Sequence, residues 1–134
     1  MPMNIESHRI LLKESLHCIE RSIQEGIDKN QRNIGFNASA AAIDMLEIYL
    51  HVEGHLALSA SIQHDWFASK RKAMEKVKVD FPNKEKIIGL IAELESKRNI
   101  LVYGKQQPKP YVEEYLNSFN AVKEHFEDLG VENE

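Results

Sequence analysis

The chain has 134 residues, of which 43% are hydrophobic and 28% are charged, and its formal net charge is −4. This length indicates one domain, residues 1–134, with a single core, and the composition is that of an ordinary globular protein. No apolar run is long enough to cross a bilayer, and the chain does not open on a signal-peptide pattern. We therefore expect a cytoplasmic protein that does not associate with a membrane.

The small net charge hides an asymmetry along the chain. Residues 66–110 contain 11 Lys and Arg against 5 Asp and Glu, a balance of +6, and the remaining residues carry −10. Such segregation is typical of a surface for phosphate-bearing partners. A solvated, lysine-rich helix face would leave the same pattern, so both interpretations stay open.

Apolar residues at helical spacing predict a first helix of about twenty residues that ends near Gly26. Its stripe is Ile5, Leu12, Leu16, Ile19 and Ile23. The polar residues 28–35 that follow predict a linker, partly helical.

A second helix is predicted from about Phe36 or Asn37 to His55, apolar over more than half of its circumference, which is typical of a central helix. Its polar exceptions, spaced by three, four and four residues, form one stripe: Asp44, Glu47, His51 and His55. This stripe is either the solvent face of the helix, or Asp44 or Glu47 points inward and pairs with Arg98.

Histidines four residues apart, such as His51 and His55, can chelate a divalent ion from one helix face. The order HVEGH is nevertheless not that of the zinc proteases, and the Glu-x-x-His signature of di-iron bundles occurs once, at Glu14 and His17. We expect neither a metal site nor a cofactor.

The segment from Ser61 to Phe81 predicts one shorter helix, anchored to the core by the single tryptophan, Trp66. His64 and Asp65 precede that anchor. They are either ordinary polar residues of a helix start or side chains that reach towards Arg98.

The most informative helix is predicted between Lys84 and Gly104, where glycine ends it. Ile87, Ile91, Leu94 and Leu101 form one stripe, on which Arg98 and Lys105 also fall. Because burying an arginine is unfavourable without an anion or water, Arg98 either extends along the helix edge into solvent or marks the start of a functional surface. We expect Ile87, Ile91 and Leu94 to be buried, Lys105 to be exposed, and Arg98 to lie at the boundary.

Pro110 suits the first turn of a last helix, whose stripe runs through Tyr115, Phe119, Val122, Phe126 and Leu129. An acidic, frayed tail is predicted from about residue 130. The whole pattern predicts an all-α fold, an antiparallel up-and-down bundle of four long helices plus one shorter helix.

This length and helix order, together with SKRNILVYG at residues 96–104, resemble the HEPN superfamily, small helical domains often found with nucleotidyltransferases. Catalytic HEPN domains resemble ribonucleases whose motif is an arginine followed, after four to six intervening residues, by a histidine. Arg98 and Asn99 match its opening, but Tyr103, Gly104 and Lys105 stand where the histidine would close it. The resemblance implies a two-fold homodimer in which two Arg98 segments meet.

Metal-independent RNA cleavage needs a group that exchanges a proton near neutral pH, and arginine cannot be that base. A protonated Tyr103 donates a hydrogen bond or stacks on a base more readily than it abstracts a proton. We therefore expect a nucleotide- or RNA-binding module, with a nucleotidyltransferase-like partner protein, rather than a nuclease. Any catalytic role falls to Arg98, Asn99 and Tyr103; the expected ligand-binding residues are Arg98, Asn99, Tyr103, Lys105, Asp44, Glu47 and His64.

Two alternatives remain. One is a toxin-type endoribonuclease whose base is displaced, which requires His51, His55 or His64 to lie close to Arg98. The other is a helical scaffold or interaction protein in which Arg98 is only a structural ion-pair residue; pairing of Arg98 with Asp44 or Glu47 would favour it.

Overall fold

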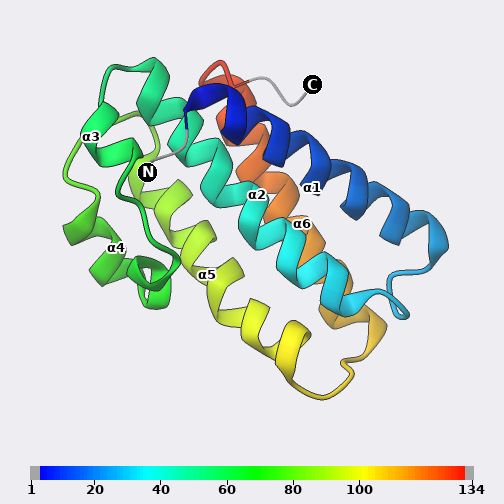
Figure 1. The fold of residues 1–134 in the computed structure, drawn as a ribbon. Helices are drawn as coiled ribbons and strands as arrows, with labels where there is room; N and C mark the ends of the chain where they lie inside the picture. Colours follow the sequence, from blue (N-terminus) through cyan, green and yellow to red (C-terminus); the bar gives the residue numbers. More distant parts are fainter. Residues whose placement is uncertain (1–3, 132–134) are drawn as a thin grey trace.

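The computed structural model describes residues 4–131, and these residues form helices and connecting loops without any strand. The all-α prediction is therefore confirmed for this part of the chain. Figure 1 shows the long helices side by side, with α1 and α5 running against α2 and α6. The elements in order are α1 (Ile5–Glu25), α2 (Gln31–Val52), α3 (Leu56–Ser59), the 3₁₀ helix η1 (His64–Ala68), α4 (Lys70–Lys76), α5 (Lys84–Tyr103) and α6 (Lys109–Asp128).

Helix α2 is the centre of the fold, because it packs against α1, α5 and α6. It begins at Gln31, inside the predicted linker, and ends at Val52 rather than at His55. Gly54, which has a φ of +86°, turns the chain back there, and the His55 amide donates to the Leu50 carbonyl at 2.8 Å. His51 and His55 therefore do not share a helix face, which removes the geometric basis of a chelating pair.

The single shorter helix predicted over residues 61–81 is wrong. Ser69 is extended, with φ −147° and ψ 154°, and separates η1 from α4. The Ser69 hydroxyl accepts a hydrogen bond from the Lys72 amide at 3.1 Å and so caps the new helix. The chain between α2 and η1 also contains the one-turn helix α3.

Helix α5 follows its prediction closely. It begins after Asn83, whose φ is +60°, and ends at Gly104. Ile87, Ile91 and Leu94 are fully buried, Lys105 is exposed and Arg98 is half-buried, as expected.

Two further predictions need correction, one for the first helix and one for the C-terminal end of the described chain. In α1, Ile23 is exposed, and the line that packs on α2 is His8, Leu12, Ser15, Ile19 and Ser22. At the other end, Val131 is buried and its amide donates to the Phe126 carbonyl at 2.9 Å, so the ordered chain extends past residue 130. The rest of the predicted frayed tail lies outside the described residues.

Helices α2 and α5 approach each other most closely at Gly35. A Cβ atom added there would lie 2.8 Å from Leu101 Cβ and 3.3 Å from Val102 Cγ2. Because Leu101 Cβ is attached directly to the backbone, only a separation of the two helices would make room.

We expect Gly35→Ala to lower the free energy of unfolding by up to about 2 kcal/mol, since overpacking of about 1–3 kcal/mol is only partly offset by a helix-propensity gain of about 1 kcal/mol. Gly89→Ala in α5 is the matched control, because its Cβ would meet nothing closer than the flexible Lys70 side chain at 3.4 Å. Urea denaturation of both variants checks this. A stabilised Gly35→Ala protein would contradict the close approach.

Candidate functional site

The candidate site is a cavity of about 430 Å³ between η1 and α5. Because positions 95, 98 and 99 fall on adjacent faces of α5, this helix presents several polar side chains to one space. The lining residues are His64, Asp65, Ala68, Glu95, Ser96, Arg98 and Asn99. The structure thus brings together three of the predicted site residues: His64, Arg98 and Asn99.

The Arg98 guanidinium has no carboxylate within ion-pair distance among the described residues. Its Cζ atom lies 5.5 Å from the centre of the Phe36 ring, a cation–π contact from α2. Phe36 is itself half exposed. Arg98 is therefore positioned by packing, and its charge is available to an anion in the cavity.

His64 is held by a buried carboxylate. Its Nδ1 atom lies 2.5 Å from Glu95 Oε1, and the Glu95 side chain is 10% exposed against 49% for His64. Glu95 also accepts a hydrogen bond from the Ser39 hydroxyl of α2. With Nδ1–H donating to Glu95, the Nε2 atom of His64 carries a lone pair that no described residue occupies.

Tyr103 and Lys105 are not among the residues that line this cavity. Both are exposed, and Tyr103 has 70% of its surface in contact with solvent. Helix α5 carries Tyr103 beyond the end of the cavity, and Lys105 follows the helix stop at Gly104.

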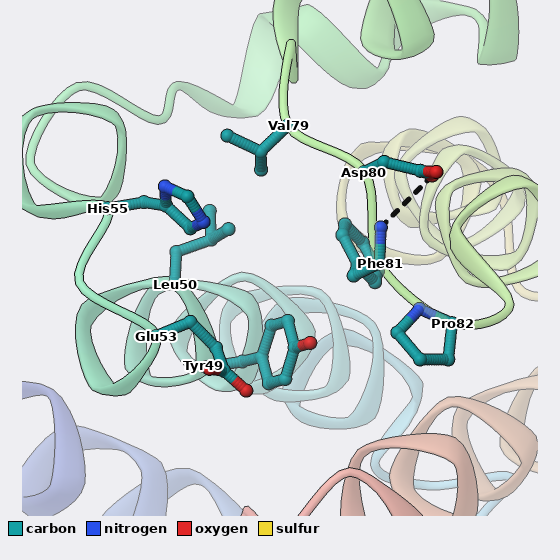
Figure 2. A pocket seen from close by; sticks show the side chains of 8 residues that line it. All are labelled: Tyr49, Leu50, Glu53, His55, Val79, Asp80, Phe81 and Pro82. Atoms are coloured by element: carbon teal, nitrogen blue, oxygen red, sulfur yellow. Dashed lines mark hydrogen bonds between the residues drawn. The ribbon is translucent and has the colours of Figure 1, made fainter.

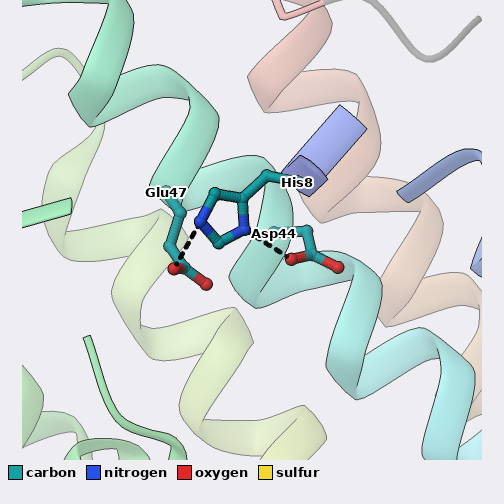
Figure 3. Close-up of side chains that lie close together, drawn as sticks. All are labelled: His8, Asp44 and Glu47. Atoms are coloured by element: carbon teal, nitrogen blue, oxygen red, sulfur yellow. Dashed lines mark hydrogen bonds and ion pairs between the residues drawn. The ribbon is translucent and has the colours of Figure 1, made fainter. Parts of the chain in front are cut away.

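Asp44 and Glu47 form a separate cluster with His8, which Figure 3 shows between the two carboxylates. His8 Nδ1 lies 3.1 Å from Asp44 Oδ1, and His8 Nε2 lies 3.1 Å from Glu47 Oε2. Both the predicted solvent face at these positions and the predicted pairing with Arg98 are therefore wrong. Helix α1 covers this side of α2 and places His8 against both carboxylates.

Burial changes the acid–base chemistry of this cluster. It raises the pKa of Glu47 to about 8, and the negative charge of Asp44 acts in the same direction. Burial also raises the pKa of Asp44, although its hydrogen bond with His8 and the charges of His8 and His64 oppose the increase.

A second pocket, of about 180 Å³, lies where α2 ends (Figure 2). His55 and Glu53 line it from one side, and Val79, Asp80, Phe81 and Pro82 from the other. The Asp80 carboxylate accepts a hydrogen bond from the Phe81 amide at 3.0 Å and so supports its own loop. The Phe81 ring contacts the ring of Tyr49 at a centroid distance of 5.3 Å, and no hydrogen bond or ion pair between described residues crosses the pocket. His55 is not among the residues that line the Arg98 cavity.

Sequence reasoning missed His8, Ser39 and Glu95. Two of them could have been found from spacing. His8 precedes Leu12, Ser15 and Ile19 at helical spacing, on the buried face of α1. Glu95 follows Ile88 and Ile91 on the buried face of α5. Polar residues on such faces indicate buried hydrogen bonds. Ser39 lacks such a signal, because small residues are common in closely packed helices.

In comparisons with known proteins, no family model matches the chain, and no curated protein or solved structure is detectably similar to it. Among residues 4–131, no helix is long and apolar enough to span a bilayer.

Proposed function

We propose that this chain is a HEPN-like module that binds the phosphate of a nucleotide or of RNA in the Arg98 cavity. The observation that carries the proposal is a half-buried guanidinium beside an open cavity with no carboxylate partner among the described residues. Arginine in this situation suits the planar, multidentate recognition of phosphate. The proposal takes the four long helices as one antiparallel up-and-down bundle in a cytoplasmic protein.

The neighbouring side chains fit the same ligand. Asn99 offers an amide donor and acceptor, and His64 offers a ring nitrogen. The exposed Phe36 ring next to Arg98 provides a surface on which a base can stack. Asp65 does not add a buried negative charge, because it is largely exposed and lies 3.9 Å from Lys72 Nζ.

We expect Arg98→Ala to weaken binding of a short single-stranded RNA or of 5′-AMP at least tenfold, roughly the contribution of one charge-assisted phosphate contact. Fluorescence polarisation at fixed salt measures this for RNA, and competition measures it for 5′-AMP. Arg21→Ala is the control, since Arg21 lies exposed on α1 and outside the cavity. If Arg98→Ala and Arg21→Ala bind equally well, the phosphate proposal is overturned.

A second candidate function is metal-independent RNA cleavage, favoured because His64 and Arg98 line one cavity. In that reaction His64 Nε2 takes the proton of a 2′-hydroxyl, which attacks the adjacent phosphorus. The bond from phosphorus to the 5′-oxygen breaks, the 5′-oxygen gains a proton from water, and a 2′,3′-cyclic phosphate results. Arg98 stabilises the charge of the phosphorane, and Glu95 keeps Nδ1 protonated and the ring oriented.

The third possibility, a helical scaffold or interaction protein, is not supported by the contact that would favour it, since Asp44 and Glu47 face His8 rather than Arg98. A nucleotidyltransferase-like partner protein remains part of the binding proposal.

We further propose that the module acts as a homodimer. Large apolar or aromatic side chains are exposed on α2 and α5 around the Arg98 end, namely Phe36, Ile100 and Tyr103. A two-fold interface would cover them with the same residues of a second copy. Sedimentation velocity at micromolar concentration is expected to give a dimer that Ile100→Asp disrupts, with Ile10→Asp on α1 as the control. A wild-type protein that sediments as a monomer would contradict this.

A further inference from the structure

The buried cluster of His8, Asp44 and Glu47 has the composition of a metal-binding site. One ligand atom from each residue lies within 4.8 Å of the other two. Helix α1 contributes the imidazole, and α2 contributes two carboxylates three residues apart on one face. Figure 3 shows the imidazole ring between these carboxylates, in the interface of the two helices.

The distances within the cluster suit a bound ion. His8 Nε2 lies 3.1 Å from Glu47 Oε2. Two ligand atoms that bind one ion at about 2.0–2.2 Å lie roughly 3 Å apart in tetrahedral or octahedral geometry. His8 Nδ1 meanwhile lies 3.1 Å from Asp44 Oδ1, the arrangement in which a carboxylate orients a metal-binding imidazole through its other nitrogen.

The cluster also has acceptors that the protein does not use. The Asp44 side chain is nine-tenths buried, yet its Oδ2 atom accepts no hydrogen bond from any described residue; the same is true of Glu47 Oε1. No lysine or arginine of residues 4–131 pairs with either carboxylate. Two buried carboxylates against one imidazole leave an excess of negative charge, which a divalent cation would neutralise.

We propose that His8, Asp44 and Glu47 bind one divalent transition-metal ion, which holds α1 against α2. His8 Nε2 and Glu47 are direct ligands, and Asp44 either orients His8 or joins the ion through its free oxygen. A donor set of one imidazole and two carboxylates favours Zn²⁺, Mn²⁺ or Fe²⁺ over Mg²⁺ and Ca²⁺, which prefer oxygen ligands alone. The site is independent of the Arg98 cavity and of the function proposed for it.

The test is zinc binding by the full chain after treatment with a chelator. We expect one Zn²⁺ per chain by elemental analysis after gel filtration, and a rise in Tm of about 5–10 °C at saturating zinc, because the ion binds only the folded state. In NMR spectra of the six histidines, the ring signals of His8 should be the ones that shift. Mg²⁺ and Ca²⁺ should change neither the Tm nor these signals.

Three near-isosteric variants, His8→Gln, Asp44→Asn and Glu47→Gln, should each bind zinc at least tenfold more weakly. Two double variants are controls: His51→Gln with His55→Gln, and Glu14→Gln with His17→Gln, which remove the other histidine pairs suggested by spacing. If His8→Gln fails to fold, the two carboxylate variants decide, since each removes a buried charge. Wild-type protein without stoichiometric zinc, cluster variants that bind as well as wild type, or a control that abolishes binding would each overturn the proposal.

Discussion

Replacing His8 by alanine is expected to lower the free energy of unfolding by about 3 kcal/mol in the presence of a chelator. His8 is 2% exposed, and its two ring nitrogens lie 3.1 Å from the carboxylates of Asp44 and Glu47. Leaving a buried polar group without its hydrogen-bond partner costs about 1–3 kcal/mol, and the loss of His8 leaves both carboxylates without this partner. Chemical denaturation followed by circular dichroism measures the change, and the Tm should fall by about 10 °C.

His17→Ala is the matched control for this prediction. His17 lies on the same helix but is exposed, so its removal should change stability by less than about 0.5 kcal/mol. Equal stability of the His8→Ala and His17→Ala proteins would show that the cluster does not connect α1 to α2.

The same cluster sets the sign of a pH effect in the metal-free protein. The pKa of Glu47 is raised from 4.5 to about 8 in the folded state. Between these values the folded protein retains a proton that the unfolded chain releases, so stability falls as the pH rises from about 4.5 to 8. Glu47→Gln removes this dependence. The free energy of unfolding of the variant, minus that of the wild type, should therefore be more positive at pH 8 than at pH 5.

Replacing His64 by alanine is expected to lower the rate of RNA cleavage at least 100-fold, if wild-type protein cleaves a single-stranded RNA to 2′,3′-cyclic phosphate ends. General base catalysis by a positioned imidazole contributes about 10²–10⁴-fold. His64 has the required arrangement: one ring nitrogen is bonded to Glu95, and the other is free beside the cavity that Arg98 lines. Gel electrophoresis of end-labelled RNA follows the reaction.

His64→Ala should retain RNA binding within about threefold, whereas Arg98→Ala should lose both binding and cleavage; this separates the base from the phosphate contact. Glu95→Gln should lower the rate of cleavage, because the neutral amide holds the His64 ring and its Nδ1–H less firmly than the carboxylate does. His55→Ala, an exposed histidine outside the cavity, is the control. Unchanged cleavage by His64→Ala would exclude His64 as the base, and absence of cleavage in the wild type would leave binding alone.

The sequence by itself determined most of the helices. Spacings of three and four residues report which side of a helix is apolar, and this local information was sufficient for the buried residues Ile87, Ile91 and Leu94 of α5 and for the stop at Gly104. Pro110 likewise lies in the first turn of α6, as expected. The predicted helix boundaries were wrong where a backbone conformation, rather than a change in periodicity, interrupts the helix, as at Gly54 and Ser69.

Only the tertiary structure decided which polar side chains meet. His8 and Asp44 are 36 residues apart, His64 and Glu95 are 31 apart, and Ser39 and Glu95 are 56 apart. Periodicity assigns a residue to a face of its own helix, but it does not give the rotation and height at which two helices pack. That packing placed His8 between Asp44 and Glu47 and left Arg98 without a carboxylate partner among residues 4–131. Asp44 and Glu47 of the predicted polar stripe contact His8 for the same reason: α1 packs against the part of α2 that local spacing assigned to solvent.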